Sequence, residues 1–180
     1  MRMLLDACVL FPTVMREMLI GTAEAGLFEP LWSERIIAEW LRASARLGET
    51  ANTIAAAEAA LMVDRHRQAT VIVKCDKSGS LPDPGDDHVL AAAISGAADG
   101  IVTRNTRDFP LRVLGAHGLS RSDPDTFLRV MWQENSDALN AVAEQVRQKA
   151  EKISGRPQEG RTLLKRAGMP RLGKAIYPKT

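Results

Sequence analysis

Cysteine, histidine and aromatic residues are scarce in this chain of 180 residues, which has 2 Cys, 3 His and only 4% Phe, Trp and Tyr. Cys8 and Cys75 do not form a disulfide framework or the ligand spacing of a zinc site. Both lie in apolar or strand-like surroundings, which is typical of buried thiols in a reducing compartment. The histidines are also scattered, at His66, His88 and His117. A metal site, if the chain has one, must therefore be built from oxygen ligands.

Long apolar runs are missing as well. No segment approaches the ~20 apolar residues of a membrane span. The start MRMLLDACVLFP is interrupted early by Asp6, and no small-residue cleavage site of a signal peptide follows it. Neither a glycine-rich phosphate loop nor a Ser-His-Asp arrangement is recognisable. We therefore expect a cytoplasmic protein without a membrane partner.

The net charge is small, +2, but it is unevenly distributed. Residues 1–119 carry 12 Lys/Arg and 15 Asp/Glu, whereas residues 120–180 carry 12 and 7. An acidic body with a basic tail is typical of a protein that brings a polyanion to an acidic site, although a tail that only aids solubility is the alternative. We place the division here, with a globular domain at 1–119 and a helical, basic extension at 120–180.

Short apolar segments alternate with helical patterns along the chain. Strands are predicted at 3–9, 69–73 and 101–103, with a fourth at 111–114. Helices are predicted at 12–25, 33–48, 50–68, 87–97 and 124–153, with Ser33 and either Thr50 or Asn52 as N-caps. A loop is expected at 76–86, and 154–180 is weakly structured by its pattern. The alternation predicts an α/β fold with a parallel sheet covered by helices on both faces.

Polar side chains lie at the ends of two of these strands. Asp6 ends the first apolar run, and Asn105 and Asp108 follow the strand at 101–103. Ligands of open α/β sheets bind outside the carboxyl ends of the strands, where Asp6 and Asn105 would meet. Each residue also has an ordinary interpretation, since Asp6 could cap the next helix and Asn105 and Asp108 could form a turn.

Three further aspartates precede or open the helix at 87–97. An acid at a helix start is stabilised by the free N–H groups and the helix dipole, which accounts for one of them. Asp86 and Asp87 together with Asp83 exceed what capping needs. Several carboxylates in one pocket repel one another and are tolerated when a divalent cation compensates them, and oxygen ligands favour Mg²⁺ or Mn²⁺ over Zn²⁺.

Glu39 is the remaining candidate acid. It lies in SERIIAEWLRA, with apolar neighbours that place it near the buried edge of the helix. By itself this pattern favours an ordinary boundary residue paired with Arg35 or Arg42.

Three segments, taken together, resemble the motifs of PIN-domain ribonucleases. LLDACVLFP resembles the first-strand motif with its acid at Asp6, and SERIIAEWLRA resembles the second with its acid at Glu39. DDHVLAAAISGAADGIVTRNTRDF resembles the third and fourth motifs, with the helix acid at Asp87 and Asn105 in place of the fourth acid. The resemblance covers residues 2 to about 114.

The resemblance implies an α/β/α sandwich around a small parallel sheet and a Mg²⁺- or Mn²⁺-dependent endoribonuclease. The implied catalytic residues are Asp6, Glu39, Asp87, Asn105 and Asp108, of which all but Asn105 would ligate the metal. Asp86 and Thr103 would not bind the metal themselves but would contact the residues that do. Thr103 would orient an acid or a water, unless it is an ordinary β-branched strand residue.

Many PIN domains are toxins of VapBC-type pairs, so the resemblance also implies an antitoxin protein as partner and a homodimer. Residues 120–180 resemble the helical C-terminal extension of some VapC-like toxins. Its basic side chains are expected to contact RNA phosphates, namely Arg161, Lys165, Arg166, Arg171 and Lys174. The alternative is that apolar residues of the same segment dock an antitoxin or a second subunit, namely Leu163, Leu164, Leu172 and Ile176.

Two other classes of function remain open. A phosphohydrolase with an Asp nucleophile on the first strand would need a second Asp two residues later, and Cys8 occupies that place. The other class is a non-catalytic RNA- or protein-binding module, in which the acid cluster would be residual and would not catalyse a reaction. The RNA that would be cut is not readable from the sequence.

Overall fold

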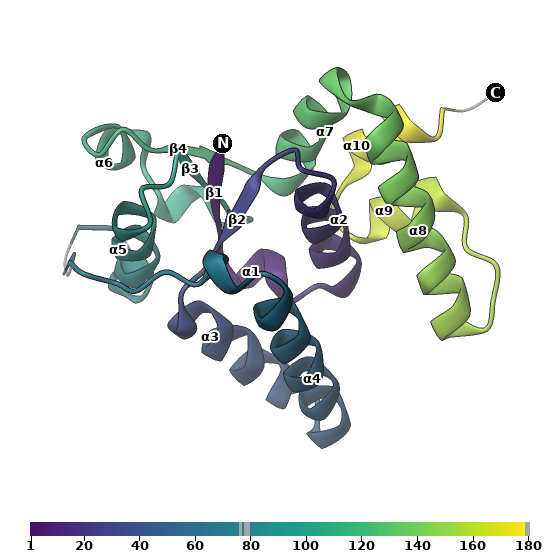
Figure 1. Cartoon of the computed structure of the whole chain (residues 1–180), viewed down its shortest axis with the longest axis horizontal. Coiled ribbons are helices and arrows are strands. Elements are labelled where there is room, and N and C mark those ends of the chain that lie inside the picture. Colours follow the sequence, from purple (N-terminus) through teal and green to yellow (C-terminus); the bar gives the residue numbers. More distant parts are fainter. Residues whose placement is uncertain (76, 78–79, 179–180) are drawn as a thin grey trace. The chain divides into compact units, whose positions relative to one another are not determined.

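A computed structural model describes residues 1–75, 77 and 80–178 and separates the chain into two compact units (Figure 1). Unit 1 comprises Met1–Phe11 and Glu29–Ser122, and unit 2 comprises Pro12–Phe28 and Asp123–Thr180. The segment after the first strand thus belongs with the C-terminal helices. The predicted division at residue 119 stays a prediction.

Unit 1 is built on a four-stranded parallel sheet in the order β2-β1-β3-β4 (Figure 1). The strands are β1 (Arg2–Leu5), β2 (Glu29–Leu31), β3 (Gly100–Val102) and β4 (Ser120–Ser122). Leu4 of β1 lies opposite Leu31 on one side and Ile101 on the other, and all three side chains are buried. A central parallel strand is apolar on both faces because helices cover both faces. The predicted α/β fold with a parallel sheet and C-terminal helices is confirmed.

The helices of unit 1 are α1 (Ala7–Leu10), α3 (Glu34–Ala45), α4 (Glu49–Arg65), α5 (Asp87–Ser95) and α6 (Leu111–Gly115). Helix α3 begins as predicted, with the Ser33 hydroxyl accepting the Ile36 N–H at 3.3 Å. The N-cap predicted for α4 at Thr50 or Asn52 is wrong. Gly48 takes that place with a φ of +109°, a conformation that a glycine adopts without strain.

Three predicted strands differ in the structure. The first ends at Leu5, because the carbonyl of Asp6 accepts the N–H groups of Val9 and Leu10 and starts α1. The apolar run 69–73 forms only one bridge, between Trp32 and Thr70, and Ile72 is 76% exposed.

The segment 111–114 is helix α6, whose first carbonyl acceptor is Pro110. Strands β2 and β4 were not predicted, because EPL and SRS lack an apolar run. Pro30 is tolerated in β2 because this strand forms an edge of the sheet. The predicted loop 76–86 includes residues 76, 78 and 79, which lie outside the described residues, and ends in the 3-10 turn η2 (Pro84–Asp86).

The regular elements in the described part of unit 2 are all helices. Its elements are α2 (Thr13–Glu24), α7 (Pro124–Glu134), α8 (Ser136–Ser154), α9 (Gly160–Arg166) and α10 (Pro170–Ile176). The prediction that 154–180 is weakly structured is wrong, because Leu164, Met169 and Leu172 are fully buried. The carboxylate of Asp125 also accepts the backbone N–H groups of Arg171 and Leu172, at 2.9 and 2.8 Å, at the start of α10. Among the described residues, no helix is both long and apolar enough to cross a membrane.

Candidate acidic metal site

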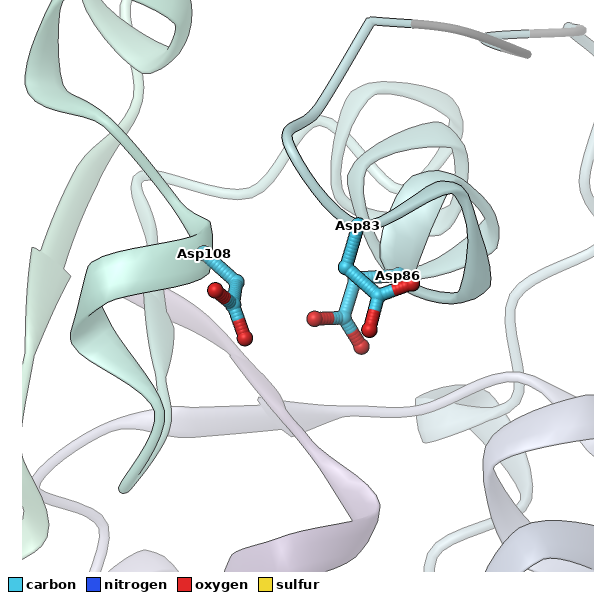
Figure 2. Close-up of side chains that lie close together, drawn as sticks. All are labelled: Asp83, Asp86 and Asp108. Carbon is cyan, nitrogen blue, oxygen red and sulfur yellow. The ribbon is translucent and has the colours of Figure 1, made fainter.

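Three carboxylates of unit 1 converge from two segments of the chain (Figure 2). Asp83 caps the start of η2 and Asp86 is its last residue, and Asp108 ends the 3-10 turn η3 (Thr106–Asp108) that follows β3. One oxygen of each residue lies within 4.8 Å of the others. Asp83 also shapes its own turn, since its Oδ1 accepts the Gly85 N–H at 2.8 Å. The cluster offers oxygen ligands only, the type that Mg²⁺ and Mn²⁺ prefer.

Asp86 is the most strongly perturbed acid of this cluster. Burial, first, and then the negative charges of Asp6, Asp83, Asp108 and Glu39 together raise its pKa from 3.8 to about 6. Its Oδ2 is buried and has no hydrogen-bond donor among the described residues. A buried carboxylate oxygen without a donor, facing four like charges, is a position that a cation would stabilise. The residues present therefore fit a divalent metal.

Asp6 is held at the end of β1 by residues of β3 and its own helix. Its backbone N–H donates to the carbonyl of Val102 at 3.1 Å, which continues the pairing of the two strands. Its Oδ2 accepts the Thr103 hydroxyl at 2.7 Å and the Cys8 thiol at 3.1 Å. Thr103 in turn accepts the Asn105 N–H at 3.0 Å. Two donors on one oxygen orient the Asp6 carboxylate and leave its second oxygen for a ligand.

Cys8 belongs to this site, which the sequence reasoning did not foresee. Burial and the neighbouring charge of Asp6 raise the pKa of its thiol to about 12, so it stays a protonated donor. The backbone N–H of Arg104 donates to its sulfur at 3.2 Å. Cys8 is half-buried rather than buried, and its position two residues after the strand-end acid is the signal that could have identified it.

Glu39 lies on α3 beside three cationic or ionisable groups. Its Oε1 is 2.9 Å from His88 Nε2, 3.5 Å from Arg35 Nε and 3.6 Å from Arg42 Nη2. Burial lowers the pKa of His88, although the charge of Glu39 acts in the opposite direction. The side chain of His88 is only 9% exposed and packs against the predicted acid. The ion pairs of Glu39 with Arg35 and Arg42, which an ordinary boundary residue would form, are thus present.

Asp87, the predicted helix acid, lies beside the cluster rather than within it. Its Oδ1 accepts the backbone N–H of Leu81 at 2.9 Å, which anchors the segment before η2. Asp86, which was expected only to contact the metal ligands, is itself a member of the cluster, and so is Asp83. Asn105 donates its side-chain amide to Asp108 Oδ2. The metal role of Asp87 stays a prediction, which variants of Asp86 and Asp87 can decide.

The five basic residues predicted to contact RNA lie on α9 and α10 of unit 2. Arg161, Lys165 and Lys174 line one pocket, whereas Arg166 is exposed outside it. Arg171 Nη1 donates to Thr126 Oγ1 at 3.3 Å. The docking role weighed for the leucines is wrong for Leu164 and Leu172, which are buried in the core of unit 2, together with Met169.

A comparison with models of protein families gives one match relevant to this site. The model described as a PIN domain matches residues 2–107, which include Asp6, Glu39 and Asp86 and stop one residue before Asp108. No curated protein and no solved structure matches the chain. PIN domains are generally metal-dependent nucleases, which agrees with a cluster of oxygen ligands and supports a hydrolase in the broad sense.

Proposed function

The chain belongs to the PIN domain family, and on this premise we propose that it is a Mg²⁺- or Mn²⁺-dependent endoribonuclease. The observation that carries the proposal is the environment of Asp86. One of its oxygens is buried without a donor in the described part of the chain, and its pKa is raised to about 6 by burial and by neighbouring acids. Such a group binds a cation more readily than it stays a free carboxylate.

We assign the metal to Asp86 and Asp108, with Asp6 as the third acid and Asp83 at the exposed edge of the cluster. Glu39 adds negative charge that acts on Asp86. A divalent ion bound by such oxygens lowers the pKa of a coordinated water and screens the charge of a phosphodiester. The set predicted from the sequence shares Asp6, Glu39 and Asp108 with this assignment and differs in the choice between Asp86 and Asp87.

The other residues of the site position these acids. The hydroxyl of Thr103 and the thiol of Cys8 hold one oxygen of Asp6. The amide of Asn105 holds one oxygen of Asp108, and His88 lies against Glu39. Each donor restricts the rotation of a carboxylate, so less entropy is lost when a metal and a substrate phosphate bind.

We also propose that the nuclease is the toxin of a toxin–antitoxin pair, with a cytoplasmic antitoxin protein as its inhibitor and a homodimer as its assembly. The support is the resemblance of the chain to VapC-like toxins and the charge of the site. Four acids act on Asp86, so a cationic side chain of a partner that enters the site would relieve their repulsion and exclude a metal. Co-purification of the chain with the product of an adjacent gene, and loss of cleavage in that complex, would support this part of the proposal.

Cleavage of total RNA by the purified chain tests the nuclease directly. We expect discrete fragments with Mg²⁺, none with EDTA, and at least a hundredfold slower cleavage by Asp86→Asn, which keeps the shape of the side chain but removes its charge. Asp64→Asn is the matched control, because Asp64 is exposed on α4 and pairs with Arg67 outside the cluster.

Two outcomes would contradict the nuclease proposal. Equal cleavage with EDTA or by Asp86→Asn would exclude a metal-dependent reaction at this cluster. RNA binding by folded protein without any metal-dependent cleavage would favour the non-catalytic binding module instead.

A further inference from the structure

Helices α9 and α10 of unit 2 enclose a pocket of about 500 Å³ that is rich in cationic side chains. Arg161 and Lys165 stand four residues apart on α9 and so share one face of that helix. Lys174 of α10 lines the same pocket, and so does Tyr177, which follows α10. The volume lies within the range of roughly 300–1,000 Å³ that is typical of sites for small ligands.

The charges in this pocket are not balanced by the protein. Glu159 is the one carboxylate among the described residues that line it. Its two oxygens accept the backbone N–H groups of Arg161 at 3.1 Å and Thr162 at 2.7 Å, and these bonds lower its pKa. In the described part of the chain, neither Lys165 nor Lys174 has a carboxylate within 4.0 Å. Three cations against one capping acid leave an excess of two positive charges, which attracts an anion.

The chemistry of the lining indicates which anion fits. The ring of Tyr177 lies directly against Gly160, where a Cβ would have no room, so one face of this ring is already covered. The pocket therefore offers cations, rather than an open aromatic surface on which a base could stack. Lysine and arginine side chains of this kind recognise phosphate oxygens without reading a base.

We propose that this pocket binds one phosphodiester group of the backbone of an RNA substrate. The inference rests on the proposed function for its ligand, but it concerns a site in unit 2 that has no part in the acidic cluster of unit 1. It also divides the basic residues predicted to contact RNA. Arg161, Lys165 and Lys174 bind the phosphate, whereas Arg166 contributes only to the general positive charge.

The test compares two double variants of the full chain. Lys165→Gln with Lys174→Gln removes two positive charges from the pocket, and Arg166→Gln with Lys152→Gln removes two from exposed positions of the same unit outside it. The probe is a fluorescent single-stranded RNA oligonucleotide, and its anisotropy is measured in EDTA so that it is not cleaved. Salt is varied from 0.05 to about 0.5 M, because phosphate contacts are recognised by their salt dependence.

We expect the pocket variant to bind the RNA roughly tenfold more weakly at physiological salt. Its slope of log K against log salt should fall by about 0.7, because the pocket neutralises one phosphate and each neutralised phosphate of a single strand contributes about 0.7. The control variant should change affinity by less than about twofold. Deletion from Gly155 onward is a poor substitute for these variants, because it would also remove Leu164, Met169 and Leu172 from the core of unit 2.

Equal losses in the two variants would overturn the inference, because they would show a diffuse electrostatic effect. Unchanged RNA binding by the pocket variant would overturn it as well, and loss of an antitoxin complex in that variant would then assign the surface to a protein partner. If the double variant fails to fold, the single variants replace it, each with weaker RNA binding than the parent and a slope change of at most about 0.7. RNA that binds through the pocket but is never cleaved with Mg²⁺ would contradict the proposed nuclease and leave this inference intact.

Discussion

The hydroxyl of Thr103 donates a hydrogen bond of 2.7 Å to Asp6 Oδ2, although the two residues are 97 positions apart in the sequence. They meet because β1 and β3 are parallel neighbours, so the carboxyl ends of the two strands lie side by side. The same oxygen accepts the thiol of Cys8 at 3.1 Å. We therefore expect Asp6 to present its other oxygen, Oδ1, to a metal.

Replacing Thr103 with valine should weaken both the fold and the activity. Valine has the same shape but leaves Asp6 Oδ2 and the N–H of Asn105 without the hydroxyl. We expect a loss of about 1–3 kcal/mol in the free energy of unfolding and of roughly tenfold in cleavage rate. Urea denaturation and a single-turnover RNA assay measure the two effects. Thr103→Ser keeps the hydroxyl and should restore most of the activity, whereas equal loss in both variants would assign the effect to packing.

The neighbouring acids Asp86 and Asp87 should respond very differently to the same substitution. Asp86→Asn removes the charge that would hold a metal, so cleavage should fall by at least about a hundredfold. Asp87→Asn keeps an oxygen that can accept the Leu81 N–H, so cleavage should fall by less than about tenfold. Rates at saturating Mg²⁺ decide between them. If Asp87→Asn is the more damaging change, the residue predicted from the sequence is the metal ligand.

The raised pKa of Asp86 makes the metal-free protein less stable as pH rises. Below pH 3.8, Asp86 is protonated in the folded and the unfolded chain, so it contributes no difference. Between 3.8 and about 6 the folded state holds the proton more tightly, and the free energy of unfolding falls with increasing pH. Above about pH 6 the carboxylate is charged in both states, and its burial among like charges destabilises the folded state to the full extent. A metal that binds the carboxylate should remove this destabilisation.

Thermal unfolding in EDTA at several pH values checks this dependence. Asp86→Asn should be more stable than the parent at pH 7–8, by about 1 kcal/mol after allowance for solvent screening, and no more stable at pH 3.5. Mg²⁺ should raise the melting temperature of the parent at pH 7–8 but not that of the variant. A parent whose stability in EDTA is flat between pH 4 and 8 would contradict the environment assigned to Asp86.

The C-terminal helices should prove to be part of a folded core. Leu172 of α10 is fully buried, so Leu172→Ala should lower the free energy of unfolding by about 2–5 kcal/mol. Ile153 is 71% exposed at the end of α8, and Ile153→Ala should change it by less than about 0.5 kcal/mol. Denaturant titrations of the two variants give this comparison. A negligible effect of Leu172→Ala would show that 154–180 is as weakly structured as its sequence pattern predicts.

Local sequence patterns were sufficient for the elements that contact mainly their own neighbours in the chain. The apolar stripe and the Ser33 cap predict α3, and the cap is confirmed by its hydrogen bond to Ile36. The apolar run interrupted by Asp6 predicts β1, although the strand ends at Leu5 and not at residue 9, and the apolar run at 101–103 predicts β3. The resemblance of three sequence segments to PIN-domain motifs also indicated the family, which the family model confirms.

Other elements depend on partners far away in the sequence. The residues EPL and SRS form β2 and β4 only because the central strands offer unpaired backbone groups, which local propensity does not reveal. Leu164 and Leu172 stand among basic residues on α9 and α10, which is a weak pattern for a core, yet packing against the other helices of unit 2 buries both. Conversely, the β-branched run 71–73 has no neighbouring strand among the described residues to continue its pairing, and Ile72 and Val73 are exposed.

The choice between Asp86 and Asp87 shows most clearly what the sequence determined and what tertiary structure decided. The sequence alone determined that two acids stand at the start of a helix, near the ends of two strands. Consecutive residues around a helix start project in directions about 100° apart, so the two carboxylates cannot face the same neighbours. Tertiary structure decided which one meets Asp83 and Asp108, because only the packing of η3 and β1 beside that helix defines the side on which the cluster lies.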